Sequence, residues 1–316
     1  MGTKVVTLFG GSGFIGRYLV RHLARQGHII RVAVRHPDRA AFLKPLGDVG
    51  QITPIPASVQ NDASVAIAVE GADAVVNFVG ILYERGKRSF QAVHVEGAQR
   101  VAAAAKTAGV QSLVQVSAIG ADSKAAAKYA RSKAAGEAAV LAAFPEATII
   151  RPSIVIGPED DFFNRFAAMT QIAPALPLIG GGTTRFQPVY VGDVAEAIAK
   201  VLLDPGHAGK TYELGGPQVY SFKELMQLLL AEIGRKRALI NLPSGLAALQ
   251  AHFLELLPVP PLTRDQVKLL KVDNVVSPEA LGFEALDMTP QAIAGILPTY
   301  LDKYRRGGRF SLQQRS

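Results

Sequence analysis

A tyrosine and a lysine stand four residues apart in the segment Tyr129-Ala-Arg-Ser-Lys133, a spacing that puts both side chains on one face of a helix. A nearby ammonium group stabilises a phenolate, so we expect it to lower the tyrosine pKa from about 10 towards working pH. Such a tyrosine can donate or remove the proton that accompanies hydride transfer, and Ser117 can hydrogen-bond a substrate carbonyl. Tyr-x-x-x-Lys also occurs by chance on ordinary amphipathic helices. Its position in the fold is therefore needed to distinguish a catalytic pair from a chance spacing.

A glycine-rich turn follows the first run of β-branched residues and leads into an amphipathic helix. Its three spaced glycines permit a tight turn, close approach of the backbone to a pyrophosphate, and packing of the helix on the strand. The helix N-terminus then offers N–H groups and a partial positive charge to phosphate oxygens. We therefore expect a dinucleotide site formed by Gly10, Ser12, Gly13, Phe14, Ile15 and Gly16.

Arg35 stands at the end of the second expected strand, where an NAD-preferring site places a carboxylate on the ribose 2'-hydroxyl. A carboxylate would repel a 2'-phosphate, whereas Arg35 can pair with one through two hydrogen bonds. Arg17, directly after the last glycine, can add a second positive charge. The expected cofactor is NADP(H), with NAD(H) disfavoured; the alternative is two surface arginines without a ligand.

The elements that must position these residues alternate between strands and helices. Six runs are expected to be strands: Val5 to Phe9, Ile29 to Val34, Ile52 to Ile55, Ala74 to Val79, Ser112 to Val116 and Thr148 to Ile150. Four stretches are expected to be helices: Phe14 to Gln26, Ala63 to Val69, Phe90 to Ala108 and Lys128 to Ala143. This alternation predicts an α/β fold, a doubly wound parallel sheet of Rossmann type with ligand at the carboxyl ends of its strands.

After Arg151-Pro152 the sequence becomes rich in proline and glycine. We expect an NADP(H)-binding Rossmann domain over residues 1–156 and a smaller C-terminal α/β domain over residues 157–316. The segment 189–203 is expected to pack back on the first domain.

The composition excludes several classes of function. Cysteine is absent from the 316 residues, which removes disulfides, thiolate nucleophiles and cysteine-ligated metals, and no metal site is expected. The formal charge of +8 favours anionic partners, but the basic residues are scattered and no nucleic-acid-binding motif is present. The first residues form a strand and a turn, so we expect no signal peptide, and no window is apolar enough for a transmembrane helix.

Taken in order, these motifs resemble the extended, atypical short-chain dehydrogenases/reductases. The resemblance rests on GGSGFIG, Asn77-Phe78-Val79-Gly80, Ser117, YARSK, Arg151-Pro152-Ser153 and PVYVGDVAEAI. More narrowly, the chain is similar to the bacterial form of the nucleotide-binding accessory subunit of respiratory complex I, NADH:ubiquinone oxidoreductase. Four phrases within roughly residues 4 to 215 indicate this: VGILYERGKRSFQAVHVEGAQRVA, VSAIGADSKAAAKYARSKAAGE, FPEATIIRPSIVIGPEDDFFNRFA and RFQPVYVGDVAEAI.

The resemblance implies a cofactor site and a location. It places the cofactor against the glycine turn, Arg17 and Arg35, and further against Ser58, Asn77, Val79, Gly80, Ser117, Tyr129, Lys133 and Pro152. Ser58 belongs to Ala57-Ser58-Val59, which replaces the aspartate that many relatives place at the adenine. The resemblance also implies NADPH held without turnover, association with other complex I subunits, and a peripheral position on the cytoplasmic side of the inner membrane.

Near the C-terminus, an apolar stripe recurs at helical spacing between Pro243 and Pro258: Leu246, Leu249, Phe253, Leu256 and Leu257. We expect this stripe to pack into the core; the alternative is a helix on a membrane lipid surface or against a membrane subunit. The final basic residues, Lys303, Arg305, Arg306 and Arg309, could bind anionic lipid or an acidic neighbour, or form a solvated tail.

Three functions stay open at this point. The first is the accessory subunit with a structural cofactor. The second is a free-standing NADP-dependent reductase or epimerase that uses Ser117, Tyr129 and Lys133 on a carbonyl substrate. The third is a redox sensor that responds to the NADPH/NADP ratio.

Overall fold

The computed structural model describes residues 2–308, which form two compact units. The first unit contains the chain up to Pro152 together with Val191–Leu214 and Ser277–Met288. The second contains Ser153–Tyr190, Gly215–Val276 and the residues from Thr289 onward. Each unit is described below by itself.

A seven-stranded parallel sheet forms the centre of the first unit. Its strands, in spatial order, are β11 (Thr211–Leu214), β6 (Thr148–Pro152), β5 (Ser112–Val116), β4 (Ala74–Asn77), β1 (Val5–Phe9), β2 (Ile29–Val34) and β3 (Ile52–Pro56). The predicted Rossmann-type α/β sheet is confirmed, and all six expected strands are present. The seventh strand, β11, was not expected, because it is short and its Glu213 breaks the apolar pattern.

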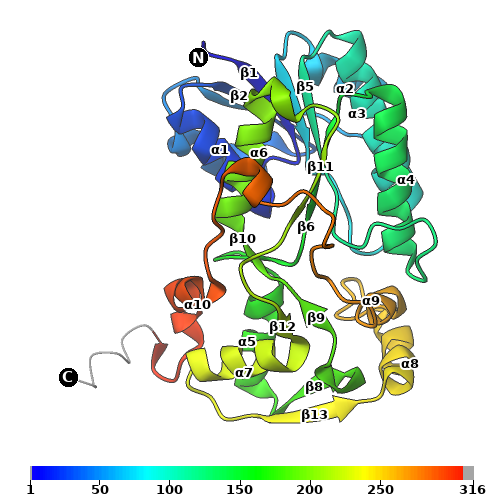
Figure 1. Ribbon diagram of the computed structural model, residues 1–316, viewed down its shortest axis with the longest axis vertical. Helices are drawn as coiled ribbons and strands as arrows, with labels where there is room; N and C mark the ends of the chain where they lie inside the picture. The colour runs from blue at the N-terminus through cyan, green and yellow to red at the C-terminus, as the bar shows by residue number, and fades with distance from the viewer. Residues whose placement is uncertain (1, 309–316) are drawn as a thin grey trace. The chain divides into compact units, whose positions relative to one another are not determined.

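Helices cover both faces of this sheet (Figure 1). On one face α1 (Phe14–Arg25) packs against α6 (Val191–Leu203). On the other lie α2 (Asp62–Val69), α3 (Glu96–Thr107) and α4 (Lys128–Ala143), the last two packed side by side. A short π-helix at Gln91–Val95 precedes α3, where the sequence predicted continuous α-helix. π-helical turns of this kind often occur at functional sites.

The order of the strands determines where a ligand can bind. Strand β1 lies between β4 and β2, so the crossovers that leave it and that return beside it run to opposite sides of the sheet. In such sheets the loops diverge at this switch point and leave a crevice at the carboxyl ends of the strands. The glycine turn after β1 and the loop after β4 border this crevice.

Strand β11 forms one edge of the sheet. The segment 277–288 runs along it: Leu281 forms a parallel bridge with Tyr212, and its C=O accepts the Glu213 N–H at 2.9 Å. This late segment therefore occupies backbone groups that an edge strand otherwise leaves unpaired.

The second unit is a smaller α/β arrangement with short strand pairs. Its strands are β7 (Val155–Ile156), β8 (Ala175–Ile179), β9 (Arg185–Phe186), β10 (Val189–Tyr190), β12 (Tyr220–Ser221) and β13 (Ala238–Leu242). Its helices are α5 (Phe162–Ile172), α7 (Phe222–Glu232), α8 (Ser244–Leu254), α9 (Arg264–Leu269), α10 (Ile293–Ile296) and α11 (Pro298–Leu301). Its core packs the apolar faces of α5 and α7 against β8 and the helices near the C-terminus.

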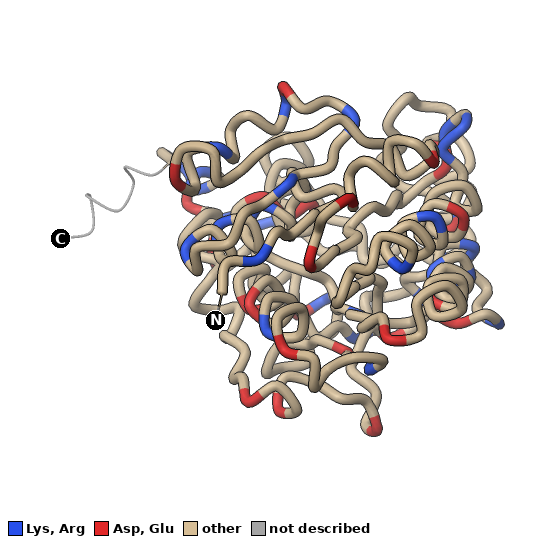
Figure 2. The backbone as a smooth tube through the Cα atoms, turned by 90° about the horizontal axis from the view of Figure 1, so that it is seen from above, with Lys and Arg blue, Asp and Glu red and all other residues tan. Residues whose placement is uncertain are grey.

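Charged residues are distributed along the chain. Figure 2 shows basic and acidic positions interspersed rather than segregated by sign. Within residues 2–308, no helix combines the length and apolarity that a membrane crossing needs.

Candidate dinucleotide-binding site

The glycine turn after β1 is a tight backbone loop. Gly10 has φ of +75°, donates its N–H to the C=O of Ala33 at 3.0 Å, and accepts the N–H of Gly13 at 2.9 Å. A Cβ on Gly16 would lie 2.6 Å from the Cα of Gly11, and a Cβ on Gly10 would lie 3.3 Å from Val79 Cγ2. The turn therefore requires glycine at these positions for steric reasons.

Helix α1 begins at Phe14 with Gly13 as its N-cap, and no side chain caps it. The N–H groups of a first helical turn have no acceptor within their own helix. The amides of Phe14, Ile15 and Gly16 therefore point, with the positive end of the helix dipole, out of the end of α1 that faces the crevice. This is an arrangement that binds phosphate oxygens.

The two arginines expected near the ribose lie on neighbouring elements. Arg17 donates from Nε to the Gly13 C=O at 3.4 Å, and its guanidinium lies 5.2 Å from the centroid of the Phe42 ring. Arg35 follows β2 directly and is exposed. Partial burial, and then the nearby charge of Arg88, lower the pKa of Arg35 from its ordinary value.

The loop after β4 is fixed by side-chain hydrogen bonds. Asn77 donates from Nδ2 to Gln115 Oε1 at 2.9 Å, and its Oδ1 accepts the Val79 N–H at 3.0 Å. Farther along, the Ile81 N–H donates to His94 Nε2 at 2.9 Å. Both polar atoms of the Asn77 side chain are therefore used in hydrogen bonds that position the loop containing Val79 and Gly80.

His94 was not identified from the sequence, yet it connects three parts of the site. Burial, and then the charge of Lys133, lower the pKa of His94 to about 3, so the imidazole is neutral near pH 7. Because Nε2 accepts from Ile81, Nδ1 is the protonated nitrogen that faces Ser132 Oγ at 2.8 Å. The His94 ring stacks on Phe90, with centroids 5.3 Å apart. The only sequence signal was a histidine one turn after an aromatic residue in an alanine-rich helix.

The structure brings Ser117 and Lys133 together at the end of β5. Lys133 is buried and donates from Nζ to the Val116 C=O at 2.9 Å. The neighbouring Ser117 is 6% exposed, and its Oγ has no hydrogen-bond partner among the described residues. An orphaned buried hydroxyl is costly unless a ligand pairs with it. One helical turn before Lys133, the Tyr129 ring packs edge-on against Phe90 and His94.

The proton affinities of this pair differ from the expectation. Burial raises the pKa of Tyr129 to about 12, and burial lowers the pKa of Lys133 to about 8 against an opposing effect of Glu137. The prediction that Lys133 lowers the tyrosine pKa was wrong for this structure. Desolvation, which penalises the charged phenolate, is the cause of the raised tyrosine pKa.

Beneath this site lies a network of buried charges. Arg151 donates to both oxygens of Glu137, at 3.0 and 2.6 Å, and to Glu213 Oε1 at 3.3 Å. The other oxygen of Glu213 accepts the Ser277 N–H at 2.9 Å. Each carboxylate thus has a charged partner, which the low dielectric of a protein interior requires.

Two further predicted residues lie at the carboxyl ends of strands, Ser58 after β3 and Pro152 at the end of β6. Ser58 accepts the Gln60 N–H at its Oγ, at 3.3 Å, and donates its own N–H to Ser64 Oγ at 3.1 Å. Pro152 ends β6, and its C=O accepts the Ile119 N–H at 3.1 Å. Both residues therefore shape loops at the carboxyl ends of the strands.

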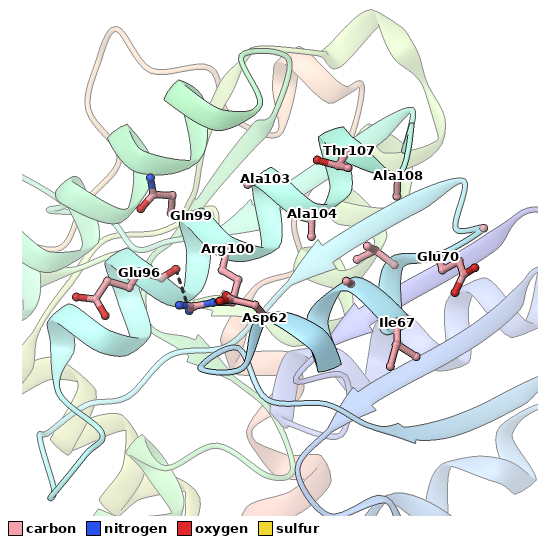
Figure 3. A pocket seen from close by; sticks show the side chains of 13 residues that line it. Asp62, Ile67, Glu70, Glu96, Gln99, Arg100, Ala103, Ala104, Thr107 and Ala108 are labelled. Atoms are coloured by element: carbon pink, nitrogen blue, oxygen red, sulfur yellow. Dashed lines mark hydrogen bonds and ion pairs between the residues drawn. The ribbon is translucent and has the colours of Figure 1, made fainter.

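A groove of about 820 Å³ lies between α2 and α3 (Figure 3). Arg100 crosses it, pairing with Asp62 and donating to the Glu96 C=O at 3.4 Å. None of the predicted site residues lines this groove. The candidate site is therefore the glycine turn together with the end of β5. The turn contains glycines that no larger residue can replace, and the end of β5 contains the Ser117 hydroxyl, which is unpaired within the described residues.

The comparison with known proteins agrees with this geometry. Residues 6–215 match the model of the NAD dependent epimerase/dehydratase family. The chain is 40% identical to NADH dehydrogenase [ubiquinone] 1 alpha subcomplex subunit 9, mitochondrial, of Arabidopsis thaliana, over 96% of this chain and 79% of that protein. Proteins of the same name from mouse, rat and Dictyostelium discoideum are also similar. The chain belongs to the NAD dependent epimerase/dehydratase family and, within it, to the group of these subunit 9 proteins.

Two other similarities bear on the site. A ceramide reductase of Caulobacter vibrioides is 30% identical, over 76% of this chain and 74% of that protein. The solved dTDP-glucose 4,6-dehydratase of Streptomyces venezuelae, which contains NAD, superposes with a TM-score of 0.73 at 22% identity, over 96% of this chain and 98% of that one. At that identity the likeness shows a shared fold.

Proposed function

We propose that the chain binds NADP(H) and acts as an accessory subunit of respiratory complex I, with the cofactor held as a structural ligand. The residues present suit a dinucleotide: the turn at Gly10 to Gly16 leaves room only for backbone, α1 has no side-chain cap, and Ser117 Oγ is orphaned. Arg35, in place of a carboxylate, favours the 2'-phosphate form.

The observation on which the subunit role rests is the extent of the similarity to subunit 9. It covers 96% of the chain and is therefore not confined to the nucleotide-binding motifs that many reductases share. Fold alone would not distinguish a subunit from an enzyme.

The proton affinities at the site support binding without turnover. When bound, the nicotinamide ring can donate or accept a hydride. A catalytic acid should have a pKa near working pH, whereas burial holds that of Tyr129 at about 12. Lys133 already donates to the Val116 C=O, and its remaining protons can reach a ribose hydroxyl. In this proposal both residues bind the cofactor.

We also propose a peripheral position on the cytoplasmic side of the inner membrane, and the surface of α8 supports the membrane contact. The helix buries only its small residues Ala247 and Ala251. The expectation that the apolar stripe between Pro243 and Pro258 packs into the core was wrong, because its side chains are exposed on α8 and on the residues directly after it: Leu246, Leu249, Phe253, Leu256 and Leu257. An apolar surface of this kind marks a contact with lipid or with another protein.

Of the basic residues near the C-terminus, Lys303 and Arg306 are exposed, whereas Arg305 is engaged within the protein. Arg305 pairs with Glu232 and donates to its C=O at 2.9 Å. Lys303 lies 5.1 Å from the centroid of the Tyr304 ring. Arg309 lies outside the described residues.

Migration with complex I tests the subunit role. Membranes of the organism that encodes the chain are extracted with a mild detergent and separated on a native gel. We expect the chain to migrate with complex I and to release NADP(H) on denaturation. Migration as a free protein in every gentle detergent would refute the subunit role, whereas complex I association without bound nucleotide would refute the cofactor.

Arg35→Asp tests the choice of cofactor. We expect the variant to lose affinity for NADPH by at least tenfold and to gain in relative affinity for NADH, because a carboxylate repels the 2'-phosphate. Unchanged relative affinities would refute the preference for NADP(H).

A free-standing NADP-dependent reductase is the second candidate. Two observations favour it: the orphaned Ser117 hydroxyl, which can bind a carbonyl oxygen, and the similarity to a ceramide reductase. NADPH oxidation is measured with a panel of carbonyl compounds. Turnover that Tyr129→Phe abolishes would establish this alternative over the structural cofactor.

A further inference from the structure

Arg88 belongs to a tight hairpin in the loop after β4. Arg85 and Arg88 each donate the backbone N–H to the other's C=O at 3.0 Å, and Gly86 between them has φ of +55°. At the base of the hairpin, Glu84 Oε1 accepts the Phe90 N–H at 2.8 Å. The backbone at Arg88 is therefore fixed by hydrogen bonds on both sides of the turn.

Hydrogen bonds join this hairpin to the exit of β2. The Val34 C=O at the end of β2 accepts the N–H of Ala57 at 2.9 Å, which ties the exits of β2 and β3 together. Three residues on, Gln60 Nε2 donates to the C=O of Lys87 at 2.9 Å. Arg88 is the next residue, so it is anchored beside the carboxyl ends of β2 and β3.

Arg35 leaves β2 at the same place, directly after Val34. Among residues 2–308, neither Arg35 nor Arg88 forms an ion pair with a carboxylate. The hydrogen bonds of the hairpin hold the backbone at Arg88 beside the exit of β2, and the charge of Arg88 adds to partial burial in lowering the pKa of Arg35. Two like charges at this end of the sheet, without a carboxylate partner among residues 2–308, favour an anion between them.

We propose that Arg88 and Arg35 together bind the 2'-phosphate of NADP(H), so that Arg88 determines cofactor specificity. This inference rests on the proposed NADP(H) site. A phosphate monoester has three acceptor oxygens and up to two charges, and planar guanidinium groups can each donate two hydrogen bonds to it. Arg17, in the first turn of α1, adds a third positive charge to the proposed site.

The test compares Arg88→Gln with Arg85→Gln, a matched control from the opposite arm of the same hairpin. The dissociation constants for NADPH and NADH are measured by calorimetry at low and at high salt. For Arg88→Gln we expect about tenfold weaker NADPH binding, unchanged NADH binding and a smaller salt dependence for NADPH, because one of the charges that contact the phosphate is gone. The control should bind both cofactors as the unsubstituted protein does. Binding of 2'-AMP, measured in the same way, should weaken in parallel with NADPH binding.

The outcomes separate the two proposals. Equal affinity of the unsubstituted protein for NADPH and NADH would refute the NADP(H) site and this inference with it. If the unsubstituted protein prefers NADPH but Arg88→Gln retains that preference, or Arg85→Gln loses it equally, the role of Arg88 is overturned and the NADP(H) site stands.

Discussion

The glycine turn of the first unit and helix α8 of the second differ in what surrounds their residues: the turn is packed by its own chain, whereas α8 exposes large apolar side chains. In the turn, Gly10, Gly11 and Gly16 contact their own chain so closely that the protein itself fills the space around each. In α8, Ala247 and Ala251 face the core, while Leu249 is 57% exposed and Phe253 63%. A pattern of small residues specifies its own contacts because nothing larger fits. A stripe of large apolar residues specifies a surface, but not what covers it.

Of the substitutions considered, Gly16→Ala in the glycine turn should have the largest effect on stability and nucleotide binding. The new Cβ would lie 2.6 Å from Gly11 Cα and 2.6 Å from its C=O oxygen, and neither backbone atom can rotate away. We expect a loss of about 4 kcal/mol or more in the free energy of unfolding, and NADPH binding weakened at least 100-fold. Urea denaturation and calorimetric titration measure the two effects.

Gly245→Ala is the control for this substitution. Gly245 lies in the first turn of α8, and a Cβ there would meet nothing within 4 Å. The variant should be unchanged or more stable by up to about 1 kcal/mol, because alanine favours helix. Equal losses at both glycines would contradict the steric argument.

Acid should weaken the site through His94. Its pKa is about 3 in the folded protein and about 6.5 when unfolded, so the unfolded state binds the extra proton between these values. The contribution of His94 to the free energy of unfolding is therefore fully present above about pH 6.5. It decreases as the pH is lowered, by about 3 kcal/mol at pH 4. Protonation of Nε2 would also place two donors, the imidazolium and the Ile81 N–H, against each other. The free energy of unfolding across pH 4 to 7 measures the loss.

His94→Gln provides the comparison for the acid effect. Glutamine retains an acceptor for the Ile81 N–H but does not titrate. The variant should start from a lower stability and show a shallower decline in acid. A slope as steep as that of the unsubstituted protein would assign the acid sensitivity to other groups.

Lys133 should have a pH dependence of the same sign, displaced into alkali. Its pKa of about 8 in the folded protein lies below its ordinary 10.5, so between these values the unfolded state is protonated and the folded state is not. The free energy of unfolding should therefore rise by about 2 kcal/mol from pH 7 to pH 10. Lys133→Met should remove this rise, while Lys128→Met, at an exposed position of the same helix, should retain it.

Substitutions on α8 should have the smallest effect on the fold. The double variant Leu249→Glu, Phe253→Glu should change stability by no more than about 0.5 kcal/mol, because both side chains are exposed. It should nevertheless abolish sedimentation with vesicles of anionic phospholipid. Gln250→Glu, on the same helix, should still sediment. Retained lipid binding by the double variant, together with loss from complex I, would identify a protein as the partner of this face.

The comparison explains which parts of the structure the sequence could predict. The strands up to β6 and the glycine turn follow from local pattern and steric necessity, and both are as expected. Strand β11 depends on pairing with the distant β6, and the π-helix lies against the distant α4. At that contact, a Cβ on Gly136 would lie 2.1 Å from the His94 C=O oxygen.

The positions of some predicted residues follow from the sequence, but their electrostatics do not. The end of a strand placed Ser117, and helix periodicity placed Tyr129 and Lys133 on one helix, whereas the contact of Lys133 with the Val116 C=O required the tertiary structure. The pKa of Tyr129 depends on burial among Phe90 and His94, which lie far from it in the chain. Arg88 could be noticed only as one of several basic residues in a loop, until hydrogen bonds placed it beside β2.

The strap of residues 277–288 along β11 has a consequence for biosynthesis. A chain leaving the ribosome can assemble the other six strands and add β11 well before Leu281 emerges. Until then β11 presents an open row of N–H and C=O groups, to which a second nascent chain could add a strand. Completion of the sheet edge is thus deferred until residues 277–288 have been made, and truncation before this segment should yield aggregates rather than a smaller folded protein.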